Sequence, residues 1–161
     1  MEASIECVNK DFATKSYNAY CAKRIDDPSG KGCFLIKKVP RKDGYVRWAI
    51  TKGSSVAAFG KVCGERSYYI HHLAWYATDH DMPKPVEEHL SHLCHNSRCF
   101  NPDHLTVESP QLNNDRKGCL VFAKCPCPCG VVFWTCKHEP KCTPPTALET
   151  ALKKSEKFSN K

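Results

Sequence analysis

Residues 91–119 read SHLCHNSRCFNPDHLTVESPQLNNDRKGC, and this stretch decides the fold. The runs LSHL and HLTVE have the character of two short strands, separated by a loop in which an Asn-Pro pair marks a turn. After the second strand, Ser109 is a suitable N-cap and Pro110 a suitable first residue for a helix. The stretch therefore predicts a β-β-α unit over residues 90–119.

The loop of this unit carries three residues with the spacing of metal ligands. They form the pattern C-x4-C-x4-H and are Cys94, Cys99 and His104. A structural zinc ion takes four protein ligands, so one must come from elsewhere in the chain. Cys33 is the predicted fourth ligand, because it would join two distant segments, and Cys63 and Cys21 remain the alternatives.

A second group of Cys and His residues follows the unit. It combines the pattern C-x-H-x3-C with an earlier Cys, and its members are Cys119, Cys136, His138 and Cys142. Four ligands make a closed, structural zinc site, as in the first group. Between them lie Cys125, Cys127 and Cys129, for which three interpretations remain open: free thiols, a replacement for Cys119, or ligands of a further metal.

The composition favours stabilisation by metal. The 161 residues suit one domain, but a hydrophobic content of 41% and a mean hydropathy of −0.51 provide little apolar core. The opening MEASIECVNKDF has neither the basic nor the apolar segment of a secretion signal, so 12 Cys beside 8 His indicate metal ligands rather than disulfides. We expect an intracellular protein, nuclear in a eukaryote, with no membrane span, because no apolar run is long enough.

Positive charge indicates nucleic acid as the partner. The formal net charge is +7, and residues 31–66 alone hold nine Lys or Arg against two acidic residues. Two zinc sites with three thiolates each would lower the net charge to about +5, which is still basic. Within this region an Asp-Gly pair separates CFLIKKV from YVRWAITK, which predicts a basic β-hairpin over residues 33–52 that fits a DNA major groove.

Two helices are expected outside the β-β-α unit. Residues 11–25 have a short helical pattern within an N-terminal arm, residues 1–30. Ser67 is a suitable cap for a second helix, whose apolar stripe consists of Ile70, Leu73, Ala74 and Ala77. His71 and His72 lie on this helix, where packing or phosphate contact is favoured over metal binding because no ligand partner lies within a turn.

The stretch from Ser91 to Cys119 resembles the His-Cys box of homing endonucleases, a branch of the ββα-metal or His-Me finger nucleases. SHLCHN, the next Cys, NP-x-HL and ES-x3-N-x2-R-x2-C occur in the family's order and spacing. The later C-x-H-x3-C also fits, although the segment before it looks longer here. Upstream, Arg47-Trp48 corresponds to an Arg-Trp pair that follows the first zinc-ligand Cys. The resemblance covers residues 33–142 and is specific only from Ser91 onward.

This resemblance implies a fold and a reaction. The fold is α+β: a zinc-stapled ββα-metal nuclease core with antiparallel DNA-binding β-hairpins, few helices and many loops. The reaction is site-specific, Mg2+-dependent hydrolysis of phosphodiester bonds in double-stranded DNA, carried out by a homodimer. His92 is implied as the general base, Asn113 as the ligand of one Mg2+, and Arg47 as the residue that braces the scissile phosphate. Arg116 has two roles of equal weight, a DNA contact and a helix cap.

The expected domain organisation follows from these motifs. Residues 31–142 form a single zinc-bound nuclease domain. It consists of a basic β-hairpin region at 31–66, the β-β-α core at 90–119 and the second zinc loop at 119–142. Residues 143–161 form a C-terminal tail that two subunits could exchange.

Three other classes of function fit parts of the sequence. A zinc-dependent DNA-binding module without catalysis would have the same fold and charge, but both catalytic positions are occupied here. A cytosolic scaffold with Cys-rich loops is not excluded by charge and cysteine count alone. A zinc hydrolase is disfavoured, since neither an HExxH helix nor the H-x-E and P-C-x-x-C pattern of the deaminases occurs.

Overall fold

The computed structural model describes residues 10–49, 67–84, 86–117, 119, 121–129, 131–144 and 146. Parts of the predictions lie outside these residues. They are the first nine residues of the arm, residues 50–66 of the basic region with Cys63, and most of the tail 143–161.

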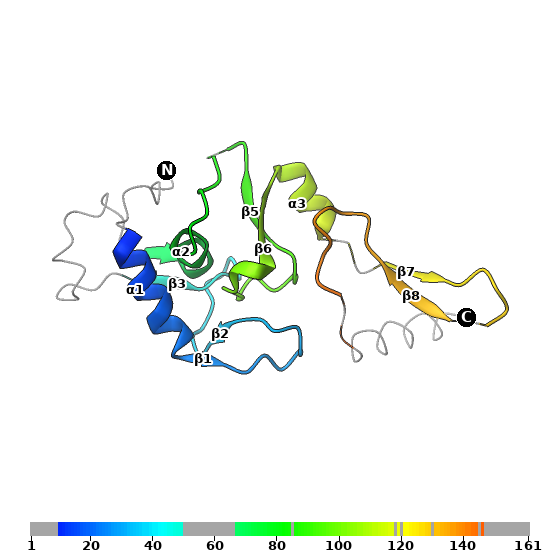
Figure 1. Ribbon diagram of the computed structural model, residues 1–161, viewed down its shortest axis with the longest axis horizontal. Helices are drawn as coiled ribbons and strands as arrows, with labels where there is room; N and C mark the ends of the chain where they lie inside the picture. The colour runs from blue at the N-terminus through cyan, green and yellow to red at the C-terminus, as the bar shows by residue number, and fades with distance from the viewer. Residues whose placement is uncertain are drawn as a thin grey trace.

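Short helices and small antiparallel sheets make up the described chain, which is the loop-rich α+β fold that was predicted (Figure 1). The helices are α1 (Lys10–Cys21), α2 (Ile70–Ala77) and α3 (Pro110–Arg116), with a 3-10 helix, η3, at Pro102–His104. The strands pair as β1 (Arg24–Ile25) with β2 (Leu35–Ile36), β3 (Arg47–Ala49) with β4 (Ser67–Tyr69), β5 (His89–His92) with β6 (Leu105–Glu108), and β7 (Val121–Lys124) with β8 (Val132–Thr135). Within the described ranges, no helix is long and apolar enough to cross a membrane.

The core lies on both sides of α2, which Figure 1 shows next to α1. On one side, a buried cluster joins the two helices and consists of Phe12, Ala13, Tyr68, Leu73 and Ala77. On the other side, a second cluster consists of Ile36, Val46, Ile70, Ala74 and Phe100. The apolar stripe predicted for this helix is therefore confirmed. Its burial holds β2, the segment just before β3 and the β5–β6 loop around α2.

Both predicted helix boundaries in this part of the chain are wrong. Ser67 does not cap α2, because it belongs to β4, whose pairing with β3 keeps the segment extended. The helix begins at Ile70, and Tyr69 occupies the N-cap without a side-chain bond. Likewise α1 ends at Cys21 rather than Ile25, because the following residues pair with β2.

The hairpin predicted over residues 33–52 is also wrong, although its turn forms. The N–H of Arg41 donates to the carbonyl of Tyr45 at 2.9 Å, and Gly44 adopts a φ of 81°. The strands on either side take other partners, β2 pairing with β1 and β3 with β4. An isolated two-stranded hairpin is marginally stable, so the burial of β2 and Val46 in the core decides the pairing.

The β-β-α unit has the predicted order of elements. In the register of β5 and β6, His89 lies opposite Glu108 and His92 opposite Leu105. The hydroxyl of Ser109 accepts a hydrogen bond from the N–H of Leu112 at 3.3 Å and caps α3. In Figure 1, α2 and α3 lie on opposite sides of the β5–β6 pair, so the two faces of β5 meet different helices.

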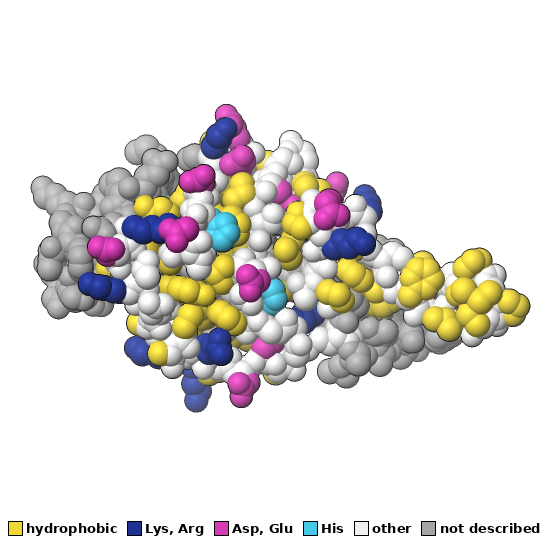
Figure 2. Space-filling view, viewed as in Figure 1, with side chains coloured by type: hydrophobic (Ala, Val, Ile, Leu, Met, Phe, Trp, Pro, Cys, Tyr) yellow, Lys and Arg dark blue, Asp and Glu magenta, His cyan; other side chains and the backbone are white. Residues whose placement is uncertain are grey.

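The β7–β8 hairpin projects away from the other elements of the described chain (Figure 1). The N–H of Cys125 donates to the carbonyl of Val131 at 2.8 Å and closes its loop. Val131 and Phe133 are exposed there. Figure 2 shows that this projecting end presents mainly side chains of the hydrophobic class, which includes Cys and Pro.

Candidate functional site

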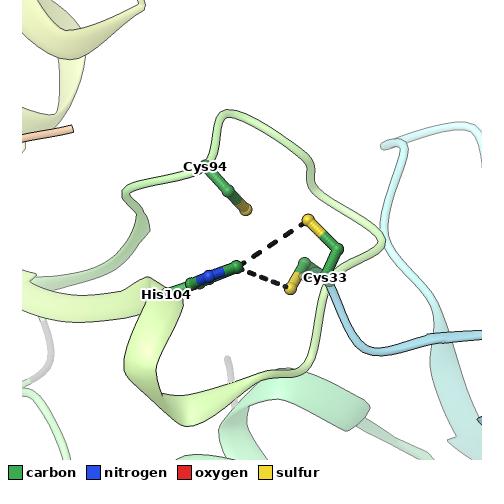
Figure 3. A group of neighbouring side chains, drawn as sticks. Cys33, Cys94 and His104 are labelled. Atoms are coloured by element: carbon green, nitrogen blue, oxygen red, sulfur yellow. Dashed lines mark hydrogen bonds between the residues drawn. The ribbon is translucent and has the colours of Figure 1, made fainter. Parts of the chain in front are cut away.

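The first Cys and His group comes together from two distant segments. Its members are Cys33, Cys94, Cys99 and His104, whose ligand atoms lie within 4.8 Å of one another. The sulfurs of Cys33 and Cys99 lie 3.8 and 3.6 Å from Nδ1 of His104. Figure 3 shows Cys33, Cys94 and His104 pointing toward one another, the first from the segment before β2 and the others from the β5–β6 loop. All three cysteines are buried, so the group connects the two segments inside the protein.

The second group lies at the base of the β7–β8 hairpin. Its members are Cys119, Cys136, His138 and Cys142, again with ligand atoms within 4.8 Å of one another. Nδ1 of His138 lies 3.0 Å from the sulfur of Cys119, 3.5 Å from that of Cys136 and 3.8 Å from that of Cys142. The group therefore joins the residue after α3 to the chain that follows β8.

Both groups have the composition and size of a tetrahedral zinc site. Zn–S bonds of about 2.3 Å and Zn–N bonds of about 2.0 Å separate tetrahedral ligands by roughly 3.5 to 3.8 Å. The sulfur-to-nitrogen distances match this interval, except that His138 lies closer to Cys119. Cys21 is not in the first group, and Cys63 lies outside the described residues.

Hydrogen bonds within the first group favour negative charge on Cys94. The thiols of Cys33 and Cys99 donate to its sulfur and hold the pKa of Cys94 far below its usual range. The same bond raises the pKa of Cys33 far above its usual range. A cation bound here would displace the remaining thiol protons, so its binding is linked to pH.

Arg116 is almost completely buried and bonded to other segments, so neither the DNA contact nor the helix cap predicted for it is seen. Its side chain is 2% exposed, and its Nε donates to both carboxylate oxygens of Glu108 at 2.9 and 2.7 Å. Its Nη1 donates to the carbonyl of Pro140 at 2.8 Å and to the sulfur of Cys142 at 3.4 Å. Arg116 thus ties β6 and α3 to the second group. A buried guanidinium takes such partners because an unpaired charge would be costly to bury.

His92 lies at the end of β5, where the strand enters the loop of the first group. Its Nε2 lies 3.0 Å from the carbonyl oxygen of Cys99. A carbonyl only accepts, so Nε2 carries the hydrogen and the neutral ring keeps its lone pair on Nδ1. Burial lowers the pKa of His92, against an opposing effect of the charge on Cys94, which favours the neutral ring near pH 7.

A cluster of rings from three segments surrounds His92. Its ring centroid lies 4.8 Å from that of His71 on α2 and 6.0 Å from that of Tyr45. Tyr69 on β4 follows, with its centroid 5.5 Å from that of His71 and 5.4 Å from that of His72. Burial lowers the pKa of His72 to about 4 and that of His71 well below its usual range. Both histidines pack in this cluster as neutral rings.

Arg47 reaches the same cluster from β3. Its guanidinium carbon lies 3.9 Å from the centre of the Tyr69 ring, and its Nη2 donates to the Tyr69 hydroxyl. The Tyr69 hydroxyl donates in turn to Asp43 at 3.1 Å. The Nε of Arg47 is buried without a hydrogen-bond partner. The guanidinium of Arg47 therefore has an unused N–H donor, and the rings of Tyr69 and His71 lie between it and His92.

Asn113 is held by two residues of β5. The hydroxyl of Ser91 donates to its Oδ1 at 2.9 Å, and its Nδ2 donates to Nδ1 of His89 at 3.1 Å. His89 and Ser91 share the face of β5 that meets α3, whereas His92 turns toward α2. An amide oxygen accepts two bonds, so Oδ1 retains one lone pair for a cation.

Sequence reasoning missed the residues that position these side chains. Ser91 carried a signal, because strand alternation puts it on the face of β5 opposite to His92 and next to the following helix. Tyr69 carried none, since its contact with Arg47 depends on the β3–β4 pairing, in which the two residues lie opposite each other. Tyr45 lies outside both strands and meets His92 only in the tertiary structure. Local sequence patterns do not predict the pairing of strands that are about 20 residues apart, such as β3 and β4.

The chain matches the family described as the zinc-binding loop region of homing endonuclease over residues 32–154. No curated protein sequence matches it. The match covers more than half of the chain, so this protein belongs to the homing endonuclease zinc-binding family. Membership confirms the resemblance seen in the His-Cys box and indicates a zinc-binding, nuclease-like protein whose partner class is DNA.

Proposed function

We propose that this protein is a site-specific, Mg2+-dependent endonuclease that hydrolyses phosphodiester bonds of double-stranded DNA, with His92 as its general base. The observation that carries the proposal is the hydrogen bond between Nε2 of His92 and the carbonyl of Cys99. It selects the tautomer in which Nδ1 can take a proton from water. The family match supports the nuclease class.

Two structural zinc ions would hold the loops that build this site. The first would bind Cys33, Cys94, Cys99 and His104, and the second Cys119, Cys136, His138 and Cys142. Cys99 supplies a ligand through its sulfur and orients His92 through its carbonyl. Zinc that holds this loop in place would therefore also hold the ring of His92 in its orientation, because the ring is bonded to the backbone of a zinc ligand.

His92 would remove a proton from the attacking water through Nδ1, and the resulting hydroxide would form the new bond to phosphorus. The proton then resides on Nδ1, while Nε2–H continues to donate to the Cys99 carbonyl and stabilises the imidazolium. The bond to the departing 3′ oxygen breaks on the opposite side of the phosphorus. The neutral rings of His71 and Tyr45 pack beside the base.

Asn113 would provide one protein ligand to Mg2+ through the free lone pair of Oδ1. The ion supplies positive charge at the phosphate and at the leaving oxygen when bound. Asn113 lies on the α3 face of β5 and His92 on the α2 face, so the base and the ligand approach from different sides. In-line displacement requires the attacking and the departing oxygen to lie on opposite sides of the phosphorus.

Arg47 would brace the scissile phosphate. Its guanidinium is already oriented by the ring of Tyr69 and by Asp43, which reduces the entropy lost on binding. Its buried Nε lacks an acceptor, which a phosphate oxygen could supply after a small movement. Positive charge there would be most valuable when the phosphate gains negative charge in the transition state.

We also propose that the enzyme acts as a homodimer. One site cuts one strand, so a double-strand break at a near-palindromic target needs two symmetric sites. The tail, residues 143–161, is the proposed exchanged element, and the nucleus is the proposed location in a eukaryote. Sedimentation of the pure protein at micromolar concentration tests the assembly: a monomer that still makes concerted double-strand cuts would exclude it.

The experiment that tests the general base separates cutting from binding. His92→Ala removes the proton acceptor but no charge that neutralises DNA, so cleavage should fall by about 10² to 10⁴ while affinity changes little. His80→Ala is the matched control, because His80 is an exposed histidine stacked on Trp75 and outside the ring cluster. Nicking of plasmid DNA is measured with and without added Mg2+, beside affinity for the same DNA.

Each outcome assigns a role to His92. Cutting by the folded His92→Ala protein at the rate of the His80→Ala control would refute the mechanism. Loss of binding in parallel with cutting would make the residue structural. A wild-type protein that binds DNA and never nicks it on any plasmid that it binds would favour the second candidate, a non-catalytic zinc-dependent DNA-binding module on the same fold.

A further inference from the structure

Three cysteines that belong to neither four-residue group converge in the loop between β7 and β8. They are Cys125, Cys127 and Cys129. The sulfur of Cys127 lies 2.8 Å from that of Cys125 and 2.6 Å from that of Cys129. The loop is therefore a third place in the described chain where soft ligand atoms gather.

The loop brings these sulfurs together through its own geometry. The hydrogen bond from Cys125 to Val131 closes it at the end of the two strands. Pro126 and Pro128 alternate with the cysteines, and each proline ring holds φ near −65°. The prolines reduce the number of conformations that the free loop can adopt, so less entropy is lost when three thiolates bind one ion.

This group differs from the other two in exposure and ligand number. Cys127 and Cys129 are exposed, whereas three of the four members of the second group are buried. Among the residues that the structure describes, no fourth Cys, His, Asp or Glu joins the three sulfurs. Zinc closes its structural sites with four ligands, so three thiolates alone would leave it with an open position.

Soft monovalent ions fit this ligand set better. Soft thiolate ligands suit Cu(I) as well as zinc. Cu(I) is stable with three sulfur ligands, whereas a structural zinc ion takes four. We propose that the β7–β8 loop is a third metal site, which binds one Cu(I)-class cation through Cys125, Cys127 and Cys129. The hairpin projects from the other elements, so this ion would be accessible from outside (Figure 1).

Binding is an exchange of protons for metal, without oxidation or reduction. Three thiols release three protons to the buffer, and one monovalent cation takes their place, which leaves a net charge of minus two. Metal–sulfur bonds near 2.3 Å would hold three sulfurs about 4 Å apart in a plane. The sulfurs must therefore move apart by roughly 1 Å through rotation of their side chains. Exposed side chains can do so without disturbing the core. Lys124, exposed and adjacent to Cys125, offers a nearby positive charge.

The test compares metal content between the wild-type protein and the triple variant Cys125→Ser, Cys127→Ser, Cys129→Ser. Cys21→Ser is the matched control, since it removes a partly exposed cysteine that belongs to no group. Reduced full-length protein, as purified with its zinc, receives Cu(I) as its acetonitrile complex without oxygen. Native mass spectrometry counts the ions per chain, and a chromogenic chelator reports released zinc.

The proposal expects one Cu(I) per chain in the wild-type and Cys21→Ser proteins, bound before any zinc is released. The triple variant should retain its zinc content and its circular dichroism spectrum, and should bind Cu(I) only as zinc leaves. Equal uptake by the triple variant, or zinc release from the wild type at the first equivalent, would overturn the site. The assignment to Cu(I) would be overturned by a third zinc ion per chain that is present in the wild type and missing from the triple variant. A disulfide among the three cysteines that persists after reduction would overturn it as well.

Discussion

Replacing Arg116 with alanine tests whether the second group depends on a buried ion pair. The substitution removes the donor to Glu108, whose side chain is 3% exposed, and leaves that carboxylate in the interior. It also removes the bonds to the carbonyl of Pro140 and the sulfur of Cys142. The consequence should be loss of stability and weaker retention of metal at the second group.

The magnitude follows from the burial of both partners. Removing one member of a buried ion pair costs about 3 to 5 kcal/mol, because the other charge is left without compensation. In a domain of this size, each kcal/mol shifts the melting temperature by about 2 to 4 °C. Arg116→Ala should therefore melt about 10 °C below the wild type, and it should release zinc to a chromogenic chelator at lower temperature.

Two further variants distinguish this role from a DNA contact. Lys117→Ala removes an exposed positive charge from the next residue and should leave the melting temperature within about 1 °C of the wild type. The double variant Arg116→Met, Glu108→Leu removes both charges and should recover most of the lost stability. The ion-pair argument fails if Arg116→Ala melts like the wild type while its DNA affinity drops.

Four other substitutions address the remaining roles. Cys94→Ala and Cys136→Ala should each reduce the zinc content by one ion per chain in native mass spectrometry. Each should also destabilise the fold by several kcal/mol, because zinc binding and folding are coupled. A full zinc complement in either variant would show that the replaced cysteine is not a ligand. Asn113→Ala should bind DNA like the wild type but require more Mg2+ for half-maximal cleavage, and an unchanged Mg2+ titration would exclude it as a ligand. Arg47→Ala should slow cleavage and lower the slope of log affinity against log salt by about one, whereas an unaltered slope would show that Arg47 does not contact phosphate.

Local spacing was sufficient to predict the β-β-α unit. The cap at Ser109 and the turn before η3 each rest on residues a few positions apart, and the structure has both. The four-residue group at the base of β7–β8 was also readable, since its last three members lie within one short segment. Helix caps, turns and metal-ligand spacing depend on residues a few positions apart, so they can be recognised in the linear sequence.

The sequence by itself determined the order of elements within the β-β-α unit, the family, and the side chains that can bind metal or take part in catalysis. Only the tertiary structure decided which of them meet: Arg47 approaches His92 through the rings of Tyr69 and His71, and Arg116 lies inside against Glu108. It also paired β2 with β1 and β3 with β4, against the local Asp-Gly signal. These contacts join segments far apart in the chain, where the burial of α2 and the cost of an unpaired interior charge outweigh local preference.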